Sequence, residues 1–194
     1  MSAALTLTAL SCIRGDRILF TGLDLSLEPG GAALVTGPNG AGKTSLLRLI
    51  AGLLLAHAGE VSTSGTMAFL AEHSALDHEV PLKQALGYWA RLDGQDTAQV
   101  DRALDAMALN PLVDVPVRML STGQLKRAAL ARIIISDSDI WLLDEPANGL
   151  DTESRARLES AIRDHRAAGG IVMVATHQAL DLPGAVPVSI GEPA

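Results

Sequence analysis

A glycine-rich segment, GPNGAGKT at residues 37–44, limits what this chain can fold into. It matches the pattern G-x-x-x-x-G-K-[ST], follows the apolar run 32–35 and precedes a periodic stretch that predicts a helix over 43–54. In such a loop, backbone N–H groups and the positive end of the helix dipole face phosphate oxygens. We therefore expect a phosphate-binding loop formed by Gly37, Pro38, Asn39, Gly40, Ala41, Gly42, Lys43, Thr44 and Ser45.

Two side chains of this loop and one carboxylate pair predict the chemistry of the site. In this motif Lys43 reaches the β- and γ-phosphates of a nucleotide, and Thr44 offers its hydroxyl to Mg²⁺. The apolar run 140–143 ends in Asp144 and Glu145, and ligand sites in open α/β sheets lie at the carboxyl ends of strands. We expect Asp144 to hold Mg²⁺, directly or through water, and Glu145 to polarise an attacking water.

A short polar segment precedes a helix that the apolar pattern predicts over 125–135. Ser121 and Gln124 have the spacing of a capping box, which starts a helix. A capped helix N-terminus that carries serine and glycine is also a receptor for phosphate. The segment therefore predicts a helix start, a phosphate contact, or both, made by Ser121, Thr122, Gly123 and Gln124.

The apolar pattern of most of the chain predicts a wound α/β sheet. Three runs, 32–35, 140–143 and 171–175, are continuously apolar, as is typical of parallel strands covered on both faces. Helical patterns lie between them, at 43–54, 81–92, 97–108, 125–135 and 152–168. We expect a single domain over 1–194, with a helical subdomain at about 75–135 and a last short strand over 186–190.

The N-terminal segments follow another pattern. Leu5, Leu7 and Ala9 alternate with polar residues, and so do three leucines at positions 23, 25 and 27. Alternation with period two is typical of half-buried antiparallel strands. We therefore expect an antiparallel β subdomain beside the α/β core.

Composition excludes several classes of protein. The 194 residues hold 15 Lys and Arg against 22 Asp and Glu, a formal net charge of −7, which argues against a nucleic-acid partner. A membrane helix needs roughly 18–20 apolar residues in a row, and the run 49–58 is interrupted by Gly52 and His57. Cys12 is the only cysteine, so no internal disulfide forms. We expect a soluble chain.

The three motifs together resemble those of the ATP-binding-cassette (ABC) ATPases over nearly the whole chain. The segment 121–124 resembles the family's signature motif, which separates it from other phosphate-loop proteins. Asn148-Gly-Leu-Asp151 resembles the D-loop, with Asp151 as its acidic residue. His177, after the run 171–175, resembles the switch histidine.

The resemblance implies an ATPase whose cofactors are ATP and Mg²⁺. ATP would bind between two subunits of an ATP-dependent dimer, with Lys43 of one subunit facing Ser121 of the other. His177 would contact the γ-phosphate and act in catalysis beside Glu145.

Within the family, the chain is similar to the short ATP-binding subunits of haem exporters of cytochrome c biogenesis, on the segments 12–20, 141–146 and 176–178. This similarity implies partner subunits that are separate integral membrane proteins, and a peripheral place on the cytoplasmic face of the inner membrane. Three alternatives stay open: an ABC ATPase subunit for another small cargo, a soluble ABC ATPase acting on nucleic acid or ribosomes, and a catalytically inactive nucleotide-binding module.

The chain departs from the family's pattern at three places. The family stacks adenine on an aromatic residue near position 14, where this chain has Arg14; its flat guanidinium can stack, and Phe20 is the alternative. The glutamine expected after the strand predicted over 66–70 is absent, and Glu72 or His73 falls near that place. Thr122 replaces the more common glycine of the signature.

Overall fold

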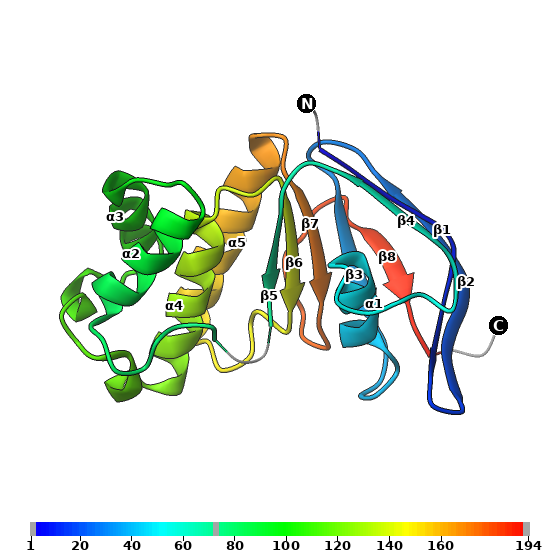
Figure 1. Ribbon diagram of the computed structural model, residues 1–194, viewed down its shortest axis with the longest axis horizontal. Coiled ribbons are helices and arrows are strands. Elements are labelled where there is room, and N and C mark those ends of the chain that lie inside the picture. Colours follow the sequence, from blue (N-terminus) through cyan, green and yellow to red (C-terminus); the bar gives the residue numbers. More distant parts are fainter. Residues whose placement is uncertain (1–2, 72–73, 192–194) are drawn as a thin grey trace.

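A parallel five-stranded sheet forms the centre of the computed structural model, which describes residues 3–71 and 74–191 (Figure 1). The strand order is β5-β6-β7-β3-β8, and every neighbouring pair is parallel. The predicted wound α/β sheet is therefore confirmed. Its strands are β3 (Ala32–Thr36), β5 (Met67–Leu70), β6 (Ile140–Asp144), β7 (Ile171–Ala175) and β8 (Val186–Ser189).

The two faces of this sheet pack into two different cores. On β6, Ile140 and Leu142 belong to one core together with helix α1 (Lys43–Ile50). Trp141 and Leu143, which alternate with them, belong to the other core, together with helix α5 (Thr152–Ala167) and the helices between β5 and β6. Burial on both faces explains why these strands are continuously apolar.

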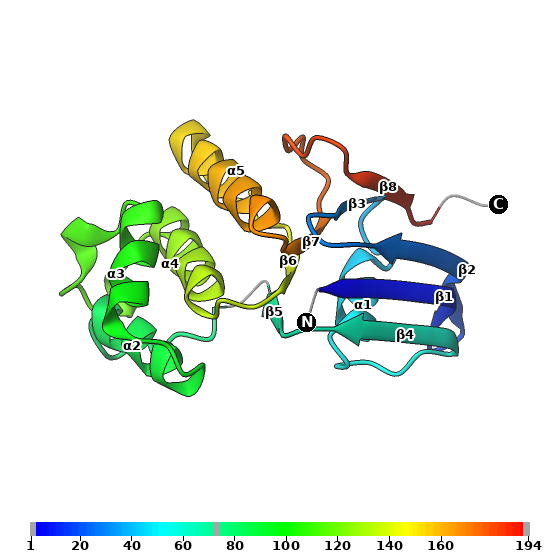
Figure 2. The ribbon, with the colours of Figure 1, turned by 90° about the horizontal axis from the view of Figure 1, so that it is seen from above.

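A second, antiparallel sheet shares the core of α1. Its strand order is β2-β1-β4, with β1 at Ala4–Arg14, β2 at Arg17–Leu27 and β4 at Ala58–Ser64. In Figure 2 this sheet lies at the opposite end of the molecule from helices α2 to α4. The antiparallel subdomain predicted from the first two strands is therefore confirmed, while β4 was not predicted.

The alternation predicted for β1 fails at Ala9. Leu5 and Leu7 are buried as expected, but Ala9 is exposed and Leu10 takes the next inward position. The register shifts between Leu7 and Leu10, and Ala9 has a left-handed φ of +46°. Its N–H donates to Asp24 Oδ1 over 2.7 Å instead of to a strand neighbour. An inserted residue of this kind is a β-bulge, which turns the following side chains to the other face.

Helices fill the chain between β5 and β6. They are α2 (Leu82–Leu92), α3 (Thr97–Ala106), the 3₁₀ turns η1 (Asn110–Leu112) and η2 (Val117–Met119), and α4 (Thr122–Ile135). Their apolar faces pack into the same core as Trp141 of β6. No helix among the described residues is long and apolar enough to cross a membrane.

Helix α1 is shorter than the sequence pattern predicts, because it ends at Ile50 rather than at residue 54. Gly52 is left-handed, with a φ of +69°. Its N–H donates to Leu49 O over 3.1 Å, and the N–H of Leu53 donates to Arg48 O over 2.8 Å. These two bonds are those of a Schellman motif, which ends a helix at a glycine.

Candidate active site

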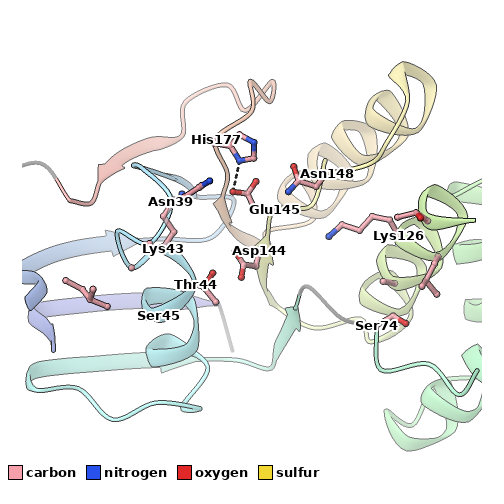
Figure 3. Close-up of a pocket in the computed structure, with 16 residues that line it drawn as sticks. Asn39, Lys43, Thr44, Ser45, Ser74, Lys126, Asp144, Glu145, Asn148 and His177 are labelled. Carbon is pink, nitrogen blue, oxygen red and sulfur yellow. Dashed lines mark hydrogen bonds and ion pairs between the residues drawn. The ribbon is translucent and has the colours of Figure 1, made fainter. Parts of the chain in front are cut away.

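The predicted site residues meet at one edge of the parallel sheet. Because β3, β6 and β7 run in the same direction, the phosphate loop, the Asp144–Glu145 pair and His177 all follow carboxyl strand ends. They surround one cavity of about 820 Å³ (Figure 3). The predicted residues that line it are Asn39, Gly40, Gly42, Lys43, Thr44, Ser45, Thr122, Asp144, Glu145 and His177.

The phosphate loop requires glycine at its first residue and at the residue before α1. Gly37 has a φ of +145°, and a Cβ there would collide with the carbonyl oxygen of Ile190. Gly42 has a φ of +115° at the start of α1. The next residue, Lys43, is only 7% exposed, and its Nζ donates to Gly37 O over 2.8 Å and to Pro38 O over 3.3 Å. The backbone of the loop therefore positions the Lys43 ammonium beside the cavity.

Asp144 and Thr44 both line the cavity, and Asp144 is only 6% exposed. Burial raises the pKa of Asp144; the interaction of its carboxylate with the Thr44 hydroxyl opposes this shift, and the neighbouring Glu145 charge adds to it. Two further cations, Lys126 and Arg48, act to lower the pKa.

This pair fits Mg²⁺ bound together with a nucleotide. Mg²⁺ prefers oxygen ligands and takes one or two protein carboxylates, with phosphates and waters completing its shell. Thr44 and Asp144 offer a hydroxyl and a carboxylate side by side. Within residues 3–71 and 74–191, no group of three or more His, Cys, Asp or Glu side chains could hold a metal on its own. The donor set therefore suits an ion that phosphates help to bind.

Glu145 is fixed at both carboxylate oxygens. His177 Nδ1 lies 2.9 Å from Oε1, and Thr176 Oγ1 donates to Oε2 over 2.9 Å. Since an ionised carboxylate only accepts, Nδ1 is the donor in this contact. The backbone of Glu145 is left-handed, with a φ of +45°, and its N–H donates to Ala175 O over 2.8 Å. This conformation turns the side chain from β6 toward the end of β7 (Figure 3).

The capping box predicted at the start of α4 is present. Ser121 N–H donates to Gln124 Oε1 over 2.9 Å, and Gln124 N–H donates to Ser121 Oγ over 3.3 Å. Because the cap starts the helix at Thr122, α4 begins three residues before the predicted 125–135. Thr122 lines the cavity of its own chain, whereas Ser121, Gly123 and Gln124 are not among its lining residues.

Asp151 caps the next helix, α5. Its Oδ1 accepts the N–H of Ser154 over 2.7 Å, and this bond lowers the pKa of Asp151. The segment that joins Asn148 to Asp151 therefore ends in a fixed helix start. Asn148, at its other end, lines the cavity.

The residues predicted to stack on a base are not among those that line the cavity. Arg14 is exposed at the end of β1, and Phe20 packs against the core shared by α1 and the antiparallel sheet. Their neighbour Leu19 lines the cavity instead. Glu72 and His73 lie outside the described residues, and the next residue, Ser74, lines the cavity.

Four lining residues besides Leu19 were not singled out by motif: Ser74, Leu125, Lys126 and Ala129. Leu125, Lys126 and Ala129 lie on α4, directly after the signature-like segment. The helical spacing could have predicted Leu125 and Lys126, since residues three and four positions after Thr122 share its helix face. Ser74 belongs to no motif, so its place depends on the path of the chain after β5.

Replacing Asp144 by asparagine is expected to raise the melting temperature of the nucleotide-free protein. Burial raises the pKa of Asp144, so the ionised carboxylate is less stable in the folded than in the unfolded chain. Asparagine has nearly the same shape and removes that cost. A gain of about 1 kcal/mol corresponds to about 2–4 °C for a chain of this size.

Thermal unfolding at a series of pH values checks this expectation. The Asp144 contribution to wild-type stability increases as pH falls through the raised folded pKa, because protonation removes the cost. The difference between wild type and Asp144→Asn should therefore shrink as the pH is lowered. A lower melting temperature of the variant at neutral pH would contradict the argument.

A phosphate loop, a buried aspartate beside it and a glutamate paired with a histidine together define the site of a phosphate-loop ATPase. A family model described as ABC transporter matches residues 20–148. An ABC transporter ATP-binding protein from Pyrococcus furiosus has the same fold, with a TM-score of 0.84 and 24% identity, over 96% of each chain.

Similar proteins of known name indicate which group of ABC transporter ATPases the chain belongs to. A "Cytochrome c biogenesis ATP-binding export protein CcmA" from Sphingopyxis alaskensis is 56% identical over 183 residues, 94% of each chain. A protein of the same name from Zymomonas mobilis is 51% identical, over 93% of this chain and 81% of its own length. The chain belongs to the ABC transporter ATPases and, among them, to the CcmA family.

Proposed function

We propose that this chain is the ATP-hydrolysing motor of a haem exporter for cytochrome c biogenesis. It would bind to separate integral membrane subunits of the CcmB and CcmC type, on the cytoplasmic face of the inner membrane. The observation that carries the proposal is the single cavity that Lys43, Asp144, Glu145 and His177 share. The similarity to the CcmA relatives supports the cytochrome c assignment.

The residues of the cavity would have separate roles in the in-line attack of water on the γ-phosphate. The loop from Gly37 to Ser45 would hold the phosphates, with Lys43 supplying the charge closest to them. Thr44 and Asp144 would hold Mg²⁺, which offsets the negative charge of the phosphates when bound. Positioning and electrostatics of this kind supply most of the catalysis in phosphoryl transfer.

Glu145 would orient the attacking water, and His177 would contact the γ-phosphate. Each carboxylate oxygen has two lone pairs, so the bonds from Thr176 and His177 leave acceptor positions on Glu145. His177 is about half exposed toward the cavity, with 52% of its side chain accessible.

The second half of each site would come from another subunit. Ser121, Gly123 and Gln124 are not among the lining residues of their own cavity, which supports their use on a partner's nucleotide in an ATP-dependent dimer. The acidic D-loop residue Asp151 would lie at the same junction.

For the adenine base, Arg14 and Phe20 remain the proposed stacking residues, and Leu19 adds an apolar contact.

The helical segment offers a surface for the membrane subunits. Tyr88 and Leu92 lie one turn apart on α2 and are 54% and 59% exposed, and Met119 of η2 is 68% exposed. Large apolar side chains that face solvent one turn apart on a helix, as Tyr88 and Leu92 do, are typical of protein–protein contacts. The partner would be a protein segment of a membrane subunit rather than nucleic acid, since the chain is acidic overall.

Co-expression with CcmB- and CcmC-type subunits tests the assignment. We expect the chain alone to be monomeric without nucleotide and to hydrolyse ATP slowly, because each site lacks its second half. With the membrane subunits present, it should be recovered in the membrane fraction and release phosphate faster. Recovery with ribosomes or nucleic acid would favour the soluble alternative, and absence of any phosphate release would favour an inactive module.

A further inference from the structure

A chain of hydrogen bonds behind the cavity centres on Gln178. Its Nε2 donates to Asn148 Oδ1 over 2.8 Å, and its Oε1 accepts from Arg155 Nη2 over 2.6 Å. Arg155 lies in the first turns of α5 and also donates from Nη1 to Ala179 O over 3.3 Å. The Gln178 side chain thereby joins the segment after β7 both to α5 and to Asn148, a residue that lines the cavity.

The backbone of Gln178 continues this chain to the reacting groups. Its N–H donates to Thr176 Oγ1 over 3.0 Å. The same hydroxyl donates to Glu145 Oε2 over 2.9 Å, and His177 holds the other oxygen of Glu145. Thr176 is 1% exposed, so its hydroxyl has little access to water as a substitute partner. The N–H of Asn148 donates directly to Glu145 O over 3.3 Å, and the bonds through Gln178 and Thr176 connect Asn148 a second time, to the side chain of Glu145.

We propose that Gln178 is a positioning residue for ATP hydrolysis, which fixes Glu145 relative to Asn148 through Thr176. The inference rests on the proposed role of Glu145 and assigns to Gln178 no contact with ATP. An amide suits this place because it donates and accepts at once: Arg155 can only donate, and Asn148 presents its oxygen. A displacement of Asn148 would shift residues 176–178 and, with them, the carboxylate of Glu145.

A double-mutant cycle tests the connection. Gln178→Met keeps the length of the side chain and removes both of its hydrogen bonds, and Asn148→Ala removes the partner in the cavity wall. We expect each single change to lower kcat about tenfold, since small displacements of reacting groups cost large factors in rate. The double variant should lose little more than either single variant, because residues that act as one unit are not additive.

The conservative variant and a matched control separate positioning from simple damage. In Gln178→Glu the carboxylate still accepts from Arg155, and a rotated Asn148 amide can donate to it, so most of the lost rate should return. Arg157→Gln removes another arginine of α5, which is 35% accessible and pairs with Glu153, and should leave kcat unchanged. In all variants the KM for ATP should change less than twofold, since no phosphate contact is lost.

Several outcomes would overturn the inference. These are a wild-type rate for Gln178→Met, a double variant with about a hundredfold loss, or a loss that appears in KM alone. If Gln178→Met does not fold, Arg155→Gln can replace it, because it removes the hydrogen bond from α5 to Gln178. It should give the same non-additive loss when combined with Asn148→Ala. Failure of the proposed function would look different, because the wild-type protein would then release no phosphate.

Discussion

Replacing Glu145 by glutamine is expected to lower the rate of ATP hydrolysis by about 10²–10⁴-fold, the range typical for loss of a general base. An amide cannot take a proton from water, and its NH₂ group would face either Thr176 or His177 where the carboxylate accepts from both. ATP binding should persist, since the phosphate loop and the Thr44–Asp144 pair are unchanged. Phosphate release and nucleotide affinity measured on one preparation separate the two effects.

Slow turnover should trap the nucleotide between two subunits. Light scattering after size exclusion should therefore show a dimer of Glu145→Gln with ATP and a monomer without it. Ser121→Arg on the same background should prevent the dimer, because a bulky side chain at the start of α4 would occupy the place of the partner's γ-phosphate. A variant that stays monomeric at saturating ATP would refute the two-subunit site, and wild-type turnover would refute the role of Glu145.

Replacing Lys43 by alanine is expected to weaken ATP binding by about 100-fold and to abolish turnover. A hydrogen bond to a charged group contributes about 1.5–3 kcal/mol, and each 1.4 kcal/mol is a factor of ten in affinity. Lys43 also ties its ammonium to the carbonyls of Gly37 and Pro38, so the loop loses an internal contact as well. Calorimetric titration with ATP measures the loss.

A second lysine provides the matched control for this change. Lys83 pairs with Asp101 on the surface of the helical segment and is half exposed, so Lys83→Ala should bind ATP like the wild type. Exposed ion pairs of this kind contribute little to stability. Normal ATP hydrolysis by Lys43→Ala would be incompatible with the phosphate-loop assignment.

Sequence patterns predicted those elements of the fold that leave a signal within their own segment. The continuous apolar runs of β3, β6 and β7 follow from burial on both faces, and the capping box of α4 depends on two residues three positions apart. The strand β4 could not be predicted in this way, because its seven residues are mostly exposed and only Val61 packs against the core. It pairs with β1 through its backbone, which leaves no apolar period in the sequence.

The candidate site was also predicted only in part. Each motif residue could be assigned from its own segment, because strand ends and helix starts determine where loops lie. The contacts between segments could not be predicted. Gln178 meets Asn148 and Arg155 only because the chain returns through β7 beside β6, and no spacing in the sequence encodes that meeting. Leu19 reaches the cavity from the antiparallel sheet for a similar reason.

The capping box at the start of α4 also determines what kind of ligand this helix start can receive. Ser121 uses a lone pair of its hydroxyl to accept the N–H of Gln124, and Gln124 uses its amide oxygen to accept the N–H of Ser121. Neither bond uses the hydroxyl proton of Ser121 or the NH₂ protons of Gln124. The cap thus leaves these donor protons available at the start of α4, beside the N–H groups and the positive end of the helix dipole, so the exposed end of the helix favours an anion.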